Sequence, residues 1–181
     1  SNDYRASLVT DGRIPEPLSL SDNGRAWAVR GEQAGGKADF ILEWDTPVRV
    51  ASVVYFARAA MMLEEGFRDY ELWVGDDQQP ALKGAFLRGG GPQVLTLDPV
   101  RTARRLKLRF LSSYGGPNPG AEEIQVLDTA PDLERLPPFL PDGWRKPEES
   151  PELTRLVADG GLGFDRMLVI RRFELNPSHV Y

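Results

Sequence analysis

Alternating apolar and polar positions recur along the first two thirds of the chain. Residues 70–74, 93–97 and 103–111 carry most of their hydrophobic side chains at every second position. A period of two is the pattern of a β-strand with one buried face and one solvated face. Residues 40–44 and 48–58 are rich in β-branched and aromatic side chains, which also favour strands. Both kinds of segment predict a sheet that packs one face on a core.

Turn-forming residues interrupt these stretches at short intervals. They are Asp45-Thr46-Pro47, Gly75-Asp76-Asp77, Gly89-Gly90-Gly91-Pro92 and Asp98-Pro99. The triple glycine lacks the Lys-Ser/Thr pair of a phosphate-binding loop, so we expect it to form a hairpin loop.

Helical propensity within this part is confined to residues 59–66, where we expect a loop with one helical turn ended by Gly66. Residues 81–87 and 124–127 add further strands. The total of about seven or eight short strands predicts an all-β fold, an antiparallel sandwich or jelly roll.

Prolines change the character of the chain after residue 128. Six of them between residues 131 and 151 predict an extended connector that cannot be a central strand. Ser150 and Pro151 predict the start of a short helix over residues 152–159, and residues 167–173 predict one more strand. We therefore divide the chain into a β-sandwich over residues 1–128 and a Pro-rich extension over residues 129–181, which we expect to lead into a further domain of a larger protein.

Charge bears on the class of partner. The formal net charge is −5 and no basic stripe carries interleaved aromatic residues, so we expect no binding to nucleic acid. Arg105, Lys107 and Arg109 would share one face of a strand, and a solvated sheet face explains them as well as a binding patch does. No apolar run approaches the ~20 residues that span a bilayer, so we expect no membrane span.

Few residues could support catalysis. The chain has no Cys, and His179 is its single His, which excludes thiolate sites and metal sites built on several His and makes a Ser-His-Asp triad implausible. Adjacent carboxylates such as Glu64-Glu65 and Glu122-Glu123 would point to opposite faces of a strand and would not form the facing pair of a glycosidase. We interpret these pairs as turn and surface residues, and we expect no enzyme activity.

Four motifs follow one another in order along residues 6–127. They are Ala6-Ser7-Leu8-Val9-Thr10-Asp11-Gly12 with a later Trp27, Arg68-Asp69-Tyr70-Glu71-Leu72-Trp73-Val74-Gly75-Asp76-Asp77, Ala103-Arg104-Arg105-Leu106-Lys107-Leu108 and Ala121-Glu122-Glu123-Ile124-Gln125-Val126. Together they resemble the discoidin, or galactose-binding-like, family, which includes coagulation-factor type C domains and family 32 carbohydrate-binding modules. The second motif departs from the family, with Gly75 in place of the usual Ser and Asp77 in place of the usual Gly. The resemblance implies an eight-stranded antiparallel jelly-roll β-sandwich with its ligand site in loops at one end.

The resemblance also implies a structural Ca²⁺ site. The matching residues are Asp11 and Glu123, with backbone carbonyls from about residues 8–13 completing the oxygen ligands that this ion prefers. The chain departs from the family directly afterwards, at residues 13–17. Asp11 could instead cap a turn, and Glu123 could instead pair with an Arg.

The family's ligand loops correspond to residues 13–25, 58–66 and 112–120. The polar side chains that they offer for ligand binding are Tyr114, Asn118, Arg58 and Asn23, together with Asp22. Sugars bind where an aromatic face stacks on the ring and planar polar groups bond its hydroxyls, which makes Tyr114 the stacking candidate. Packing of Tyr114 on the end of the barrel is the alternative, and we expect Trp27, Trp44 and Trp73 to belong to the core.

The function that these features favour is a non-catalytic carbohydrate- or glycan-binding accessory module of a larger secreted or cell-surface protein. We expect an extracellular, periplasmic or cell-surface location and a monomer that contacts neighbouring domains. The alternative is a structural protein–protein interaction module with no small-molecule site, which the scarcity of loop aromatic residues and the Pro-rich arm favour.

Overall fold

The computed structural model describes residues 4–16, 21–58, 62–144 and 155. The chain divides into two compact units, Ser1–Trp144 and Arg145–Tyr181. The helix predicted over residues 152–159 and the strand predicted over residues 167–173 lie outside the described residues, apart from Arg155, which is helical.

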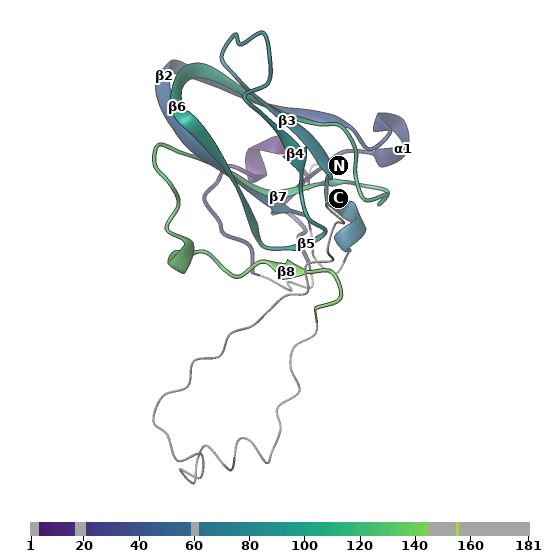
Figure 1. Ribbon diagram of the computed structural model, residues 1–181. Helices are drawn as coiled ribbons and strands as arrows, with labels where there is room; N and C mark the ends of the chain where they lie inside the picture. Colours follow the sequence, from purple (N-terminus) through teal and green to yellow (C-terminus); the bar gives the residue numbers. More distant parts are fainter. Residues whose placement is uncertain (1–3, 17–20, 59–61, 145–154, 156–181) are drawn as a thin grey trace, which may run out of the picture. The chain divides into compact units, whose positions relative to one another are not determined.

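Strands dominate the described part of the chain (Figure 1). They are β1 (Trp27–Ala28), β2 (Ala38–Ala57), β3 (Asp69–Val74), β4 (Leu82–Ala85), β5 (Gly89–Gly90), β6 (Pro92–Phe110), β7 (Gly120–Leu127) and β8 (Leu140–Pro141). The helical segments are short: α1 (Gly31–Ala34) and the 3-10 helices η1 (Ala6–Leu8), η2 (Leu63–Glu65) and η3 (Leu133–Arg135). The all-β class is therefore confirmed, and η2 supplies the single helical turn expected in residues 59–66.

The two long strands, β2 and β6, build both layers of a sandwich. The start of β2 pairs antiparallel with the end of β6, from Ala38 opposite Phe110 to Glu43 opposite Arg105. The end of β2 pairs with the start of β6, from Ser52 opposite Thr96 to Phe56 opposite Pro92. β3 and β4 continue the first layer beside the end of β6, and β7 and β1 continue the second beside the end of β2. Figure 1 shows β2 and β6 running side by side along their lengths.

The core lies between these layers and contains most of the large apolar side chains. Tyr55 in the second layer lies 5.6 Å from Phe110 in the first, measured between ring centroids, and 4.2 Å from Phe86. Trp27 packs on the edge of this cluster against Phe40, Phe67 and Phe110. Opposing inner faces of this kind form the centre of an antiparallel sandwich.

Two predicted turns lie inside continuous strands, which corrects the sequence analysis. Residues 44–47 of β2 lie between the paired residues Glu43 and Val48 and face only Arg104 on β6. A β-bulge of this kind absorbs extra residues and bends the strand without ending it. The Asp98-Pro99 segment lies in a matching irregularity of β6, opposite Ala51. Turn residues here mark the bends that carry β2 and β6 from one layer to the other.

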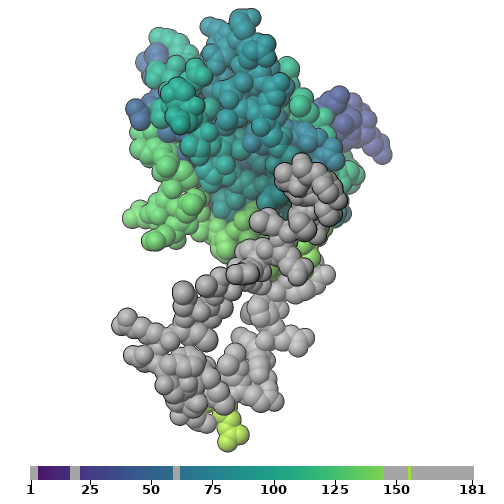
Figure 2. All heavy atoms as spheres, viewed as in Figure 1, coloured from purple at the N-terminus to yellow at the C-terminus, as the bar shows by residue number. Residues whose placement is uncertain are grey.

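The triple glycine is also not a free hairpin loop. Gly89 and Gly90 pair antiparallel with Pro141 and Leu140, so β5 holds the segment that follows the sandwich. Residues 129–144, which the sequence analysis assigned to the extension, lie within the compact unit that ends at Trp144. Figure 2 shows these residues, in light green, against the teal body of the sandwich.

The outer face of the first layer carries the predicted basic residues. Arg105 pairs with Glu43 at 3.2 Å and Arg109 with Asp39 at 3.0 Å, each across neighbouring strands. Lys107 lies 4.7 Å from the centre of the Trp73 ring. A solvated sheet face therefore explains this cluster. Trp73 lies on this face and not in the core, because it alternates with the buried Leu72 and Val74.

We expect Gly89→Ala to release the segment that β5 holds. An added methyl group would meet the Phe139 ring and the Leu140 carbonyl, and overpacking of this kind costs about 1–3 kcal/mol. Urea unfolding should show a loss of that size, and limited proteolysis should cut residues 129–144 faster. Gly66→Ala is the control, because its methyl group meets no atom closer than 3.4 Å. An equal loss in the free energy of unfolding in the two variants would contradict the conclusion that β5 holds residues 129–144.

Candidate functional site

The three predicted ligand loops converge on one buried side chain, Arg58. This residue directly follows β2, and only 6% of its surface is exposed. Its Nε lies 2.5 Å from Oδ2 of Asp22, and its Nη1 pairs with Glu65 and also donates to the Asn118 carbonyl at 2.9 Å. One guanidinium therefore ties together the loops around residues 22, 65 and 118.

The Arg58 cluster is closed by further contacts. Asp22 is 5% exposed and Glu65 is 1% exposed, so both carboxylates depend on Arg58 for compensation of their charge. The Tyr4 ring lies 4.6 Å from the guanidinium carbon, and its hydroxyl bonds Asp22. Burial opposes the charge of Arg58, but the hydrogen bond and charges of the two carboxylates outweigh it and raise the pKa of Arg58.

The other three predicted ligand residues lie around this cluster and differ in how far their side chains are exposed. Asn23 and Asn118 are exposed. Tyr114 is partly buried, and its hydroxyl donates to the Phe86 carbonyl at 2.6 Å. Its backbone N–H donates to Gly66, which fixes the 112–120 loop against the loop that contains η2. Arg58 and Tyr114 are therefore held by the protein, whereas the two asparagine side chains face solvent.

A hollow of about 510 Å³ lies at this end of the sandwich, between α1 and the 112–117 loop. Glu32, Ser112 and Ser113 supply its polar side chains, and glycines form most of the remaining wall. The backbone of Gly31 donates to Pro117 at 2.7 Å, which fixes α1 against the loop. None of the described residues that line this hollow is aromatic.

The predicted metal residues, Asp11 and Glu123, lie close enough for the charge of Asp11 to act on Glu123, the third residue of the closing motif. Glu123 is 1% exposed, and its Oε1 accepts a hydrogen bond of 3.1 Å from the Gly12 N–H. Its Oε2 is buried and has no hydrogen bond of normal geometry within the described part of the chain. Burial raises the pKa of Glu123 to about 7, and the charge of Asp11 acts in the same direction. The Gly12 N–H, the Gln125 side chain and the Asp11 backbone act against this rise in pKa.

Carboxylates alone would not complete a cation site around Asp11 and Glu123. Asp11 is exposed, accepts a hydrogen bond from the Arg13 N–H and lies 3.5 Å from the Arg13 Nε. Among the described residues, no group of three or more acidic, His or Cys side chains is arranged to hold a metal ion. The donor set, with one buried unpartnered carboxylate oxygen, fits an ion such as Ca²⁺ that also takes backbone carbonyls.

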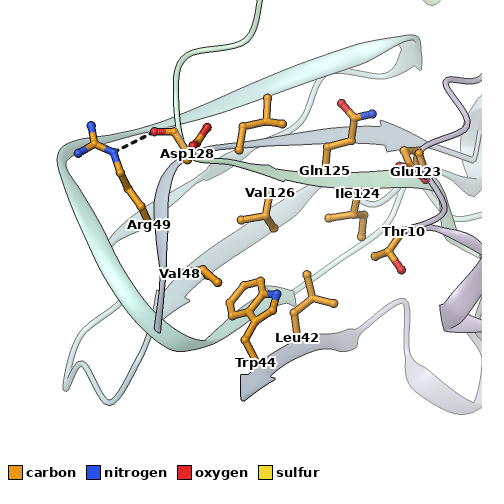
Figure 3. Close-up of a pocket in the computed structure, with 12 residues that line it drawn as sticks. Thr10, Leu42, Trp44, Val48, Arg49, Glu123, Ile124, Gln125, Val126 and Asp128 are labelled. Carbon is orange, nitrogen blue, oxygen red and sulfur yellow. Dashed lines mark hydrogen bonds between the residues drawn. The ribbon is translucent and has the colours of Figure 1, made fainter. Parts of the chain in front are cut away.

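A groove of about 800 Å³ runs along the side of the sandwich, between β7 and the first half of β2 (Figure 3). Leu42, Trp44 and Val48 of β2 lie opposite Ile124 and Val126 of β7. Arg49 and Asp128 lie at one end of the groove, and Thr10 and Glu123 lie at the other.

Sequence reasoning missed several residues that the structure brings to these sites. Glu65 was interpreted only as a member of a surface pair, yet it is buried. Glu123 was named as a metal candidate, but the interpretation of its acidic pair as surface residues is wrong, since it is buried too. A signal for Glu65 was present, since Arg58 precedes it by seven residues in the same predicted loop. Trp44 was assigned to the core, but it is only partly buried and lines the side groove.

Solved structures share this fold, although their sequences differ widely from this one. No protein-family model matches the chain, and no curated protein matches it. The module CpGH89CBM32-5 of Clostridium perfringens, in complex with GalNAc-β-1,3-galactose, is 19% identical over 70% of this chain and 85% of its own, with a TM-score of 0.54.

Two further structures give the same result. The family 32 module of NanJ from C. perfringens, in complex with galactose, is 15% identical over 70% of this chain and 86% of its own, with a TM-score of 0.55. An F5/8 type C domain from Bacteroides fragilis is 19% identical over 68% of this chain and 80% of its own, with a TM-score of 0.52. The chain therefore has the discoidin-like β-sandwich fold of family 32 carbohydrate-binding modules and type C domains.

Proposed function

We propose that this chain is a non-catalytic glycan-binding accessory module, and that its sugar site lies where the three loops converge on Arg58. The observation that carries the proposal is this convergence, on a fold shared with carbohydrate-binding modules. Fixed loops reduce the entropy that a ligand must overcome when it binds. Asn23 and Asn118 then present amide groups, which both donate and accept hydrogen bonds, to the hydroxyls of a sugar.

Arg58 acts in this proposal as a positioning residue. Its side-chain nitrogens are occupied by Asp22, Glu65 and the Asn118 carbonyl, so it orders the loops and does not itself contact the sugar. Tyr114 offers its ring for stacking on the sugar at the same end, and its hydroxyl donates a hydrogen bond to the Phe86 carbonyl.

We also propose that Asp11 and Glu123 hold a structural Ca²⁺. The unpartnered Oε2 of Glu123 and the nearby charge of Asp11 support this assignment. When bound, the ion supplies positive charge that compensates the buried carboxylate and ties the segment after η1 to β7. The ion has no chemical role in this proposal.

The place of the module in the cell is part of the same proposal. We assign it to an extracellular, periplasmic or cell-surface protein, in which it works as a monomer attached to other domains. Among the described residues, no helix is long and apolar enough to cross a membrane.

A protein–protein interaction module remains the second candidate. The observation in its favour concerns the loop end, which is the end of the sandwich where the loops around residues 22, 65 and 118 meet. The Arg58 guanidinium at its centre is already paired with Asp22 and Glu65 and is not available to a sugar. Sugar binding at the loop end separates this candidate from the first.

Removal of the Asn118 side chain should weaken sugar binding without weakening the fold. Arg58 bonds the backbone carbonyl of Asn118, so Asn118→Ala leaves the ion cluster intact. Loss of one or two hydrogen bonds should weaken binding about threefold to tenfold, measured by calorimetric titration with galactose and GalNAc-β-1,3-galactose. Tyr114→Phe, which keeps the ring, should bind as the unchanged protein does. Equal binding by Asn118→Ala, Asn23→Ala and Tyr114→Ala would remove this site and leave the second candidate.

Neutralisation of Arg58 should strongly destabilise the protein. Arg58→Met leaves Asp22 and Glu65 buried without a counter-charge, and breaking a buried pair in this way costs about 3–5 kcal/mol. Urea unfolding should detect this loss. The variant that combines Arg58→Met with Asp22→Asn and Glu65→Gln should recover a large part of it. No recovery would show that Arg58 contributes through packing and not through charge.

Calcium should raise the thermal midpoint relative to a chelator. A ligand at about a hundredfold excess over its Kd adds about 2.7 kcal/mol to the free energy of unfolding. Glu123→Gln should abolish the shift, because the amide replaces the charged oxygen. Asp76→Asn, in the exposed turn after β3, is the control and should keep the full shift. A shift that persists in Glu123→Gln would place the ion elsewhere.

A further inference from the structure

The side groove lies away from the loop end and between two strand edges. β7 pairs with β2 only from Ser52 to Ala57, and β6 pairs with the other edge of β2. No described strand covers the remaining edge of β2 from Ala38 to Val50. The inner faces of both layers therefore meet solvent along this side, where Leu42, Trp44 and Val126 pack on the margin of the core.

Trp44 differs from the other tryptophans of the sandwich layers in what its ring contacts. Trp27 packs on three aromatic rings. Trp73 receives Lys107 on its face and donates its indole N–H to Glu71 at 3.2 Å. Trp44 has no aromatic, cationic or hydrogen-bonding partner among the described residues. Its ring also borders a second hollow, of about 410 Å³, beside Arg104 and Arg105.

Polar groups lie at both ends of the apolar lining of the side groove. Arg49 is exposed, and its Nε donates to the Asp128 carbonyl at 3.0 Å, which fixes the guanidinium at the rim (Figure 3). Its two terminal nitrogens have no partner among the described residues, so their donors are available. Thr10, with a hydroxyl that both donates and accepts, lies at the opposite end.

An added β-strand is a poor occupant for this edge. Pro47 has no backbone N–H to donate, and the bulge over residues 44–47 breaks the regular spacing of the edge. Asp39 and Glu43 of the same strand are already paired with Arg109 and Arg105 of β6. The proline and the bulge protect a strand edge against pairing with another chain. The groove instead suits a compact ligand that has apolar faces and a polar perimeter.

We propose that this groove is a second glycan subsite, in which a pyranose ring stacks on Trp44 and bonds Arg49 through its hydroxyls. This inference rests on the proposed function and adds a site that is separate from the loop end. A pyranose has the required form, since its C–H faces pack on an aromatic ring while its hydroxyls point outward. Two subsites on one module strengthen binding to a long or branched glycan through effective concentration.

The test uses the full chain, labelled with ¹⁵N, in the presence of calcium. Galactose, GalNAc-β-1,3-galactose and maltose are titrated while the indole N–H signal of Trp44 and the amide signals of Asn23 and Asn118 are followed. At least one sugar should shift the Trp44 signal in a saturable way. Asn118→Ala should leave that shift unchanged, since its side chain lies at the other site.

Two groove variants and one matched control show which side chains contribute to sugar binding in the groove. Arg49→Ala removes an exposed side chain, so the fold is retained, and it should weaken the Trp44 titration at least about threefold. Trp44→Ala should abolish groove binding, which the Arg49 and Thr10 signals report. Trp73→Ala removes an equivalent indole from the outer face and should leave groove binding unchanged. If Trp44→Ala fails to fold, Arg49→Ala decides the matter alone.

Three outcomes would overturn the proposal, and they can be told apart. Shifts confined to Asn23 and Asn118 would keep the loop-end site and reject the groove. No shift at either site with any of these sugars would reject the groove and count against the proposed function as well. A Trp44 signal that responds to 1-hexanol but to no sugar would make the groove an apolar docking surface.

Discussion

The continuous pairing of β2 with β6 is the constraint on which the rest of this structure depends. Each strand contributes one half to each layer, so a single antiparallel pair fixes the position of both layers. All six strands β1, β7, β2, β6, β3 and β4 belong to one hydrogen-bonded sheet. The bulges opposite Arg104 and Ala51 bend β2 and β6, so that the two halves of this sheet form the two layers. The same bends leave the first half of β2 without a second neighbour, and the side groove results from that open edge.

Arg58 has a comparable role at the loop end. The ends of β2 and β7 bring three segments together, but they do not specify how those segments lie against one another. The buried guanidinium supplies directional hydrogen bonds to each of them, with two carboxylates and one carbonyl as acceptors. An Arg suits this position better than a Lys, since its planar group reaches several acceptors at once. Charge neutralisation and loop order are therefore provided by one residue.

Glu65 and Glu123 show how burial alone leaves the role of a carboxylate open. Both are 1% exposed. Glu65 is paired with a guanidinium, and its charge is compensated within the protein. Glu123 accepts a hydrogen bond from the Gly12 N–H on Oε1, whereas its buried Oε2 has no hydrogen bond of normal geometry among the described residues, and burial raises its pKa to about 7. The first carboxylate is a structural element, whereas the second retains an unused ligand atom.

The sequence by itself determined the all-β fold class, the family of folds and the buried face of the alternating strands. Leu106, Leu108 and Phe110 alternate with basic residues, and both faces lie where the period of two predicts. The ligand loops could be predicted to meet because the family resemblance implies a ligand site in loops at one end of the sandwich. The partners within those loops could not, since the Asp22, Arg58 and Glu65 cluster depends on contacts between distant segments.

Only the tertiary structure decided three other points. Turn residues at positions 45–47 and 98–99 became bends in long strands, because cross-strand pairing on both sides outweighed their local preference. Gly89 and Gly90 became a strand that pairs with Pro141 and Leu140, and the lack of a side chain at Gly89 permits the close approach of this segment. Trp44 and Trp73 both lie on strands of the first layer, but on opposite faces: Trp44 packs on the margin of the core and lines the side groove, whereas Trp73 lies on the outer face beside Lys107. The alternation of residues along a strand fixes which side chains share a face. The register and bending of strands that are distant in the sequence decide whether that face contacts the core, a groove or solvent.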